Sequence, residues 1–314
     1  MKRNDATLIV DMAQYRKILP HMMKRRCDSL VYQTVEVDLT KTVQFVKQQN
    51  RLHPEDHQYR VFEVFIAAVM RTIALRPEVN RFVARYQYWQ RNEHSLTFVI
   101  KEDYTDEAPE HSTPIIMQPD MTLPEMALII DKTIEDARTP SNENFTDEAI
   151  GFFMRFPLWI IRMVVNLAGF LDRMGKAPKA LREADGLHTS VFIANLGSIG
   201  LAGGSPHHHL YEWGTTSMFV TMGTLRRNRI RTGDKTTFSD TMEVGFTVDE
   251  RVTDGFYFMN TIRTFQNLLN NPEELLERPT LPPPPKTKKQ YKLEQKAKKK
   301  AHKAAKKQML TKSV

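Results

Sequence analysis

Residues 241–255 read TMEVGFTVDERVTDG, and this stretch decides the fold. Apolar residues alternate with polar ones from 241 to 249, which is the period-2 pattern of a strand with one buried face. From 256 to 269 apolar residues recur at helical spacing instead, so a helix follows. Residues 249–255 are therefore a strand-to-helix turn, and their polar side chains are well placed for chemistry.

Working outward from this turn, the same patterns predict a chain of alternating strands and helices. Pro77 ends the buried helix because the residue before a proline avoids the helical conformation. Asn271 is predicted to cap a last short helix that starts at Pro272. The predicted elements are a basic helix at 15–26, strands at 32–39, 189–195 and 217–225, a buried helix at 62–73 and a charged hairpin at 226–235.

The turn resembles the signature of the acyltransferase core of the 2-oxoacid dehydrogenase complexes and of chloramphenicol acetyltransferase. That signature reads His-x-x-x-Asp-Gly, usually within Asp-His-Arg-x-x-Asp-Gly, and residues 249–255 read DERVTDG. Residues 77–80 (PEVN) and 195–197 (NLG) also resemble the family, and the resemblance runs from about residue 15 to 276. It implies an α/β fold of two layers, the coenzyme A-dependent (chloramphenicol acetyltransferase-like) acyltransferase fold. In that fold a mixed sheet carries helices on one face, and the chain assembles as a homotrimer.

The resemblance also implies an acyl transfer that uses a coenzyme A thioester as co-substrate and no bound metal. In the family, the signature His removes the proton of a thiol, a Ser on a neighbouring strand bonds the oxyanion, and the Asp pairs with an Arg. By position, Asp254 and Arg16 keep that pairing. However, Glu250 stands where the His would be, and Ala194 stands where the Ser would be.

These two replacements weaken the family reaction. Deprotonating a thiol with a carboxylate of ordinary pKa about 4.3, in place of an imidazole of about 6.5, costs roughly 3 kcal/mol more. Loss of an oxyanion donor lowers a rate by about 10²–10³. The sequence therefore leaves two functions open: a stand-alone acyltransferase with an unknown acceptor, or an inactive homologue that serves as a trimeric scaffold.

If the chain is active, the sequence supplies substitutes. Glu250 is a candidate base, or else a buried carboxylate bonded to Arg251 or to another cation. Asn195 is a candidate oxyanion donor, and His208 and His209 belong to a run of three histidines that either acts in catalysis or packs beside Trp213. No second cluster completes a tetrahedral ligand set for that run, so we assign no metal ligands.

An insertion at about 140–186 interrupts the resemblance. Its apolar part carries Arg155, Arg162, Asn166 and Arg173, which fall on one narrow stripe at 100° per residue. Internal arginines argue against a transmembrane span. Residues 150–174 therefore form a helix or hairpin that packs on the core or on another subunit, or a helix that lies in a membrane surface.

The net charge of +8 comes from the end of the chain, where residues 282–314 carry twelve lysines and one acid. This Pro/Lys-rich tail is expected to be disordered in isolation, or nascently helical. We expect it to bind RNA or anionic lipid by charge, or only to aid solubility. Residues 1–281 form the acyltransferase-like domain. With Cys27 as the single cysteine, we expect a cytoplasmic protein, either free or peripheral to the membrane.

Overall fold

The computed structural model describes residues 3–101, 105, 110–138, 151, 154–179, 182, 185–201, 209–232 and 235–312. Its main sheet has the strand order β2-β10-β8-β7-β5-β6, and β9 pairs with β10 beyond the end of β2. The pairs β5–β7 and β7–β8 are parallel and the others are antiparallel, so the sheet is mixed as predicted. The strands are β2 (Leu30–Asp38), β5 (His94–Lys101), β6 (Glu110–Met117), β7 (Val191–Asn195), β8 (Met218–Met222), β9 (Arg226–Thr232) and β10 (Lys235–Asp249).

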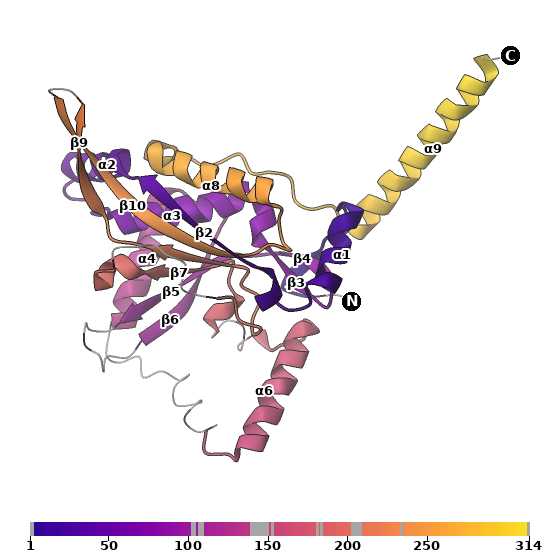
Figure 1. The fold of residues 1–314 in the computed structure, drawn as a ribbon, viewed down its shortest axis with the longest axis horizontal. Helices are drawn as coiled ribbons and strands as arrows, with labels where there is room; N and C mark the ends of the chain where they lie inside the picture. Colours follow the sequence, from indigo (N-terminus) through magenta and orange to yellow (C-terminus); the bar gives the residue numbers. More distant parts are fainter. Residues whose placement is uncertain are drawn as a thin grey trace.

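Helices pack on one face of this sheet and form the second layer, as Figure 1 shows for α2, α3 and α8. The helix α3 is buried along nearly its whole length, because apolar residues occupy almost every position of VFEVFIAAVMRTIAL. The expected α/β fold with helices on one face is confirmed. The helices of this layer are α2 (Thr40–Leu52), α3 (Val61–Leu75), α4 (Leu123–Arg138) and α8 (Gly255–Asn270).

The deciding stretch folds as its pattern predicts. In β10, Val244, Phe246 and Val248 point into the core against α8, which begins directly after the turn. Phe265 of α8 packs edge-on against Phe65 of α3, with ring centroids 5.2 Å apart. The apolar residues that alternate in β10 and those that recur at helical spacing in α8 therefore pack into the same core.

A second, smaller sheet lies beside the start of the chain. It has the order β1-β4-β3 and packs around Trp89 and Phe82, both fully buried. Its strands are β1 (Ala6–Leu8), β3 (Arg81–Ala84) and β4 (Gln87–Arg91). The short helix α1 (Gln14–Met22) is tied to this sheet because the Tyr88 hydroxyl donates a 2.7 Å hydrogen bond to the carbonyl of Arg16.

Three elements extend away from the body in Figure 1: the β9–β10 hairpin, α6 (Leu158–Arg173) and α9 (Lys288–Lys312). The hairpin was expected. The tail was expected to be disordered in isolation or nascently helical. From Lys288 onward it is helical, because Lys, Ala and Gln are good helix formers and Glu294 forms ion pairs with Lys286 and Lys298. The short helix predicted after Asn271 is confirmed as a 3₁₀ helix (Pro272–Leu276) with Asn271 at its N-cap position, although the Asn271 side chain makes no capping hydrogen bond.

Candidate active site

The signature turn is held together by the pair Asp249 and Arg251. The Asp249 carboxylate is fully buried, and it accepts hydrogen bonds from Arg251 Nε at 2.8 Å and Nη2 at 2.6 Å and from the Ser29 hydroxyl at 2.9 Å. Burial alone would lower the pKa of Arg251, but its hydrogen bonds with Asp249 raise that pKa. The turn is therefore held by the ion pair between Asp249 and Arg251, and the side chain of residue 250 takes no part in it.

That residue, Glu250, is exposed at the tip of the turn. Its backbone N–H donates a 2.9 Å hydrogen bond to the carbonyl of Ser29, which fixes the backbone while its side chain faces solvent. The interpretation of Glu250 as a buried carboxylate bonded to Arg251 is wrong, because Arg251 is bound by Asp249. Glu250 is consequently accessible to a substrate or to a second copy of the chain.

Asp254 closes the turn at the start of α8. Its carboxylate accepts a 2.7 Å hydrogen bond from the backbone N–H of Tyr257 and so caps the helix. The pairing with Arg16 that the resemblance implies is present but loose: Arg16 lies 3.9 Å from Asp254 and 3.0 Å from Glu78. Arg16 also donates to the carbonyl of Arg251. It therefore joins α1 to the signature turn, with Glu78 as its closer partner.

Asn195 lies at the last position of β7, beyond the buried Ala194. Its Oδ1 accepts a 3.2 Å hydrogen bond from the backbone N–H of Ser198 and caps a short 3₁₀ turn. This bond orients the side chain and uses its acceptor oxygen, not its NH₂ donors. Asn195 is thus a fixed amide at the end of a strand.

The structure does not bring Asn195 and Glu250 together within one chain. Asn195 is opposite Met222 of β8, and Met222 is opposite Val244 of β10. Glu250 is six positions further along the chain than Val244, which is about 20 Å at ~3.3 Å per residue. The two candidate groups therefore lie toward opposite ends of the sheet.

His209 lies on the Glu250 side. It is followed by Leu210, which packs with Leu30 and Phe219, and Leu30 is the register partner of Asp249. The His209 ring is 4.8 Å from that of Tyr211. His207 and His208 lie outside the described residues, so the predicted role of His208 stays a prediction.

The loop that follows His209 is anchored by Arg26. The buried Arg26 side chain donates to the carbonyls of Tyr211 at 2.6 Å and Gly214 at 2.7 Å, and its backbone N–H donates to the Glu212 carboxylate at 2.6 Å. A cavity of 490 Å³ lies beside this loop, and Arg251 of the signature turn forms part of its wall. Glu250 is not among the residues that line it.

Sequence reasoning missed His188, which lies behind that loop. Its ring nitrogens are 3.2 Å from Asp172 and 3.0 Å from Asp185, and Trp213 Nε1 donates to Asp185. Burial alone would lower the pKa of His188, but the two carboxylates raise it. No sequence motif marks this cluster, because its members come from α6, from residue 213 and from the turn before β7.

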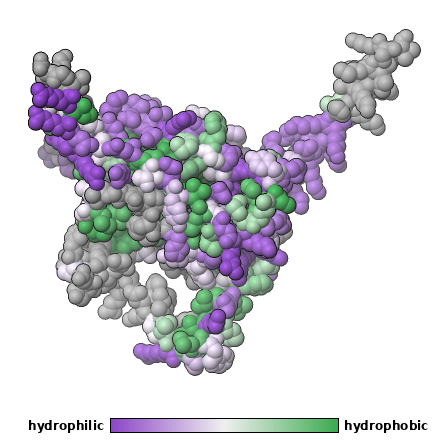
Figure 2. Space-filling view, in the orientation of Figure 1, coloured by the Kyte–Doolittle hydropathy of each residue, from purple (hydrophilic) through white to green (hydrophobic). Residues whose placement is uncertain are grey.

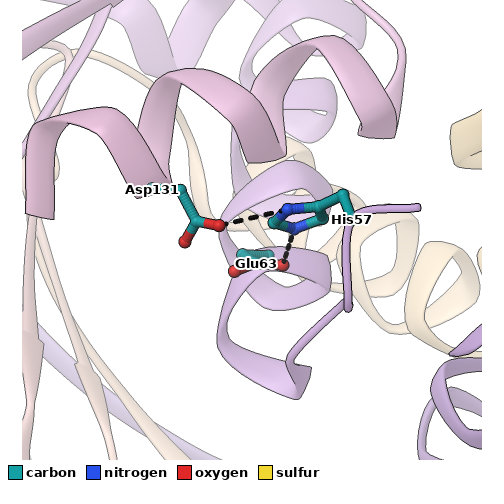
Figure 3. A group of neighbouring side chains, drawn as sticks. All are labelled: His57, Glu63 and Asp131. Atoms are coloured by element: carbon teal, nitrogen blue, oxygen red, sulfur yellow. Dashed lines mark hydrogen bonds and ion pairs between the residues drawn. The ribbon is translucent and has the colours of Figure 1, made fainter. Parts of the chain in front are cut away.

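A second unmarked cluster joins α3 to α4, and Figure 3 shows His57 between the carboxylates of Glu63 and Asp131. The distances are 2.9 Å to Glu63 and 3.1 Å to Asp131. Among the described residues this is the one group whose spacing suits a metal ion. However, Arg60 also contacts both carboxylates, with Nε 2.6 Å from Glu63. The guanidinium supplies the positive charge that a metal would bring, so the cluster is an ion-pair network.

Comparisons with known proteins agree with the resemblance read from the turn. The family model of the 2-oxoacid dehydrogenases acyltransferase (catalytic domain) matches residues 173–277, which include β7 and the whole signature. Comparison with curated proteins found no match. The expected resemblance is confirmed over this third of the chain.

Solved structures share the fold over most of the chain. A probable dihydrolipoamide acetyltransferase from Listeria monocytogenes 4b F2365 is 14% identical with a TM-score of 0.54, over 83% of this chain and 94% of that one. The cubic core of a pyruvate dehydrogenase multienzyme complex is 14% identical with a TM-score of 0.54, over 85% and 93%. A chloramphenicol acetyltransferase is 13% identical with a TM-score of 0.55, over 84% and 99%. At these identities the likeness establishes the fold.

Proposed function

We propose that this protein is an acyltransferase whose active site forms between copies of the chain, with Glu250 of one copy facing Asn195 of the next. The observation that carries the proposal is the signature turn. Its buried Asp249–Arg251 pair and its Asp254 helix cap are kept, and they hold an exposed carboxylate at the position where the family has its base. Because these interactions of the family's signature turn are present here, we infer that the active site at the turn is present as well.

The separation of the two groups supports a site shared between copies. Glu250 and Asn195 are about 20 Å apart along the sheet in one chain, too far for both to contact one reacting thioester. A closed ring of identical chains brings one end of each subunit against a different surface of the next. A related fold is found in the cubic core of a pyruvate dehydrogenase complex, which favours such a symmetric assembly, and we propose a homotrimer.

In the proposed reaction, the Glu250 carboxylate takes the proton of an acceptor thiol or hydroxyl. The resulting anion attacks the carbonyl carbon of a coenzyme A thioester, and the Asn195 NH₂ group of the neighbouring copy donates to the oxyanion. Collapse of the tetrahedral intermediate breaks the carbon–sulfur bond and releases the coenzyme A thiolate, which takes up the proton. His209, on the same side of the sheet as Glu250, is the candidate to relay that proton.

Mixed oligomers test this arrangement. Glu250→Gln removes the base at constant size, and Asn195→Asp removes the NH₂ donor while it keeps the oxygen that caps the 3₁₀ turn. The two variants are co-expressed with different tags and purified over both. In a mixed trimer with shared sites, one site of three combines an intact Glu250 with an intact Asn195, so about a third of the wild-type rate returns.

Free coenzyme A released from acetyl- and longer acyl-coenzyme A is measured by chromatography, with and without dihydrolipoamide as acceptor. Each variant alone should be at least a hundredfold slower than wild type. Mixed trimers no more active than the separate variants would contradict a shared site. Wild-type protein without turnover on any donor would leave only the second candidate function.

That second candidate is a scaffold attached to a membrane surface, and it is favoured by the exposed apolar side chains of α6. Leu158 and Trp159 are 79% and 68% exposed, and Figure 2 shows hydrophobic residues on this helix at the bottom of the view. Arg162 and Arg173 lie on one edge of the helix, where they would meet anionic headgroups. No helix in the described part of the chain is long and apolar enough to cross a membrane.

Co-sedimentation with phosphatidylglycerol–phosphatidylcholine vesicles tests the attachment. Trp159→Ser should lower the bound fraction severalfold. Leu128→Ser, which removes an equally exposed apolar side chain from α4, is the matched control and should leave binding unchanged. Equal loss in both variants, or no binding by the wild type, would exclude the membrane.

A further inference from the structure

A cavity of 610 Å³ lies on the side of the molecule where α9 meets the small sheet. It is lined by α1, by the start of the chain through β1, by the β3–β4 turn and by the first turns of α9. Apolar side chains contribute one part of its wall, among them Leu8, Val10 and Met12. This volume suits a small-molecule ligand. No residue of the signature turn lines the cavity, and it shares Arg85 and Tyr86 with the cavity beside Arg251.

All the charged side chains that line this cavity are positive. Its lining includes Lys17, Arg85, Lys288 and Lys292 and contains no acidic residue. Asp11, close by, is paired with Lys286 at 3.1 Å. Four cations around an apolar wall favour a ligand that combines several negative charges with a flat or apolar body.

Aromatic rings supply the surface for such a body. Tyr86 stacks on His21, with ring centroids 4.9 Å apart and an angle of 10° between the rings, and half of the Tyr86 side chain remains exposed. Tyr291 of α9 also lines the cavity. A planar base could extend this stack, as bases do on aromatic side chains.

The backbone at the same place is strained. Arg85 and Tyr86 form the β3–β4 turn with φ of +49° and +61°, a left-handed conformation usually left to Gly or Asn. Within the described residues they are the two non-glycine residues with positive φ. Residues in rarely populated backbone conformations cluster at ligand sites. An Arg and a Tyr at positions that favour Gly or Asn therefore indicate that their side chains have a role beyond forming the turn.

We propose that this cavity binds a nucleoside polyphosphate, with the base stacked on Tyr86 and Tyr291 and the phosphates held by Lys17 and Lys292. Two kinds of ligand contain the base and the phosphates that this site would recognise: a free nucleotide such as ADP, and coenzyme A through its phosphorylated ADP end. The site is argued from its own residues and stands whether or not the protein transfers acyl groups.

Isothermal titration of the full-length protein with ADP, coenzyme A and inorganic pyrophosphate at fixed salt tests the proposal. ADP and coenzyme A should bind, and pyrophosphate should bind at least tenfold more weakly than ADP because it has no base. Coenzyme A binding that Tyr86→Gly weakens, without ADP binding, would assign the site to coenzyme A. Coenzyme A binding that Tyr86→Gly leaves unchanged, without ADP binding, would overturn the proposal. Binding of ADP with no acyl transfer on any donor would leave this site intact and remove only the proposed function.

Variants locate the binding. Tyr86→Gly removes the ring and suits the left-handed backbone, so the protein stays folded while ADP affinity should fall at least tenfold. Lys292→Ala should lower ADP affinity severalfold. Lys300→Ala, on the same helix two turns further from the cavity, is the matched control and should have no effect. Unchanged affinity in Tyr86→Gly, equal losses in Lys292→Ala and Lys300→Ala, or pyrophosphate binding as tight as ADP would overturn the proposal.

Discussion

At the scale of single residues, Asp249 and Arg251 explain how the signature survives the replacement of its central residue. Each neutralises the other in the interior, and the turn is held by their hydrogen bonds and by Ser29. The side chain between them takes no part in this network. Position 250 is therefore free to change without loss of the fold, which is consistent with the Glu that stands there.

Asp249→Asn should destabilise the fold by about 3–5 kcal/mol, because it leaves the Arg251 guanidinium buried without a counter-charge. Urea unfolding followed by circular dichroism measures the change. The double variant Asp249→Asn with Arg251→Met should recover much of the loss, since the unpaired charge is gone. Equal stability of the wild type and Asp249→Asn would show that the pair does not hold the turn.

His188 should make stability depend on pH. Its pKa is raised in the folded protein by Asp172 and Asp185, so the folded state holds a proton that the unfolded state releases above about pH 6.5. The stabilisation is fully present below that pH and is lost as pH rises through the folded pKa. Thermal unfolding from pH 5.5 to 9 should show this decline, and His188→Gln should flatten it. A wild-type profile that rises over the same range would contradict the assignment.

At the scale of elements, the β3–β4 hairpin turn carries a measurable cost. A non-glycine residue in the left-handed region destabilises the folded state by roughly 1–2 kcal/mol. Glycine removes this cost, but it loses more conformational entropy on folding, which offsets part of the gain in stability. Tyr86→Gly should therefore stabilise the protein by about 0.5–1 kcal/mol. Urea unfolding measures it, with Tyr86→Phe as the control that keeps both ring and strain. A less stable glycine variant would mean that the stack on His21 outweighs the strain.

The sequence predicts that the helix α6 forms, but it does not predict which part of the helix packs on the body. Its polar stripe is visible in the sequence, and it forms the predicted helix. Whether its apolar residues pack on the body depends on contacts far along the chain. In the structure the first turns project away, and burial begins only near Asp172 and Gly169, where Trp213 approaches.

At the scale of the whole molecule, the acidic body and the basic tail behave as separate parts. The segment before α9 meets the body through the exposed pair Lys286–Asp11, and α9 itself meets it near Tyr291. Such an exposed ion pair contributes little to stability, because water and salt screen the two charges. A chain that ends at residue 281 should therefore unfold within about 1 kcal/mol of the full-length protein. Urea unfolding of both forms is the measurement, and a larger loss would make α9 part of the folded core.

The sequence by itself determined the strand, turn and helix of the signature, the helical layer on the sheet, and the frame in which Glu250 replaces a histidine. These follow from local periodicity and from a short motif, because residues close in the chain share one strand or one helix. Only the tertiary structure decided that Glu250 is exposed, that Asn195 lies about 20 Å away, that His188 sits between two carboxylates, and that Tyr86 faces a basic cavity. Those facts depend on sheet register and on contacts between distant segments, for which a single sequence holds no local signal.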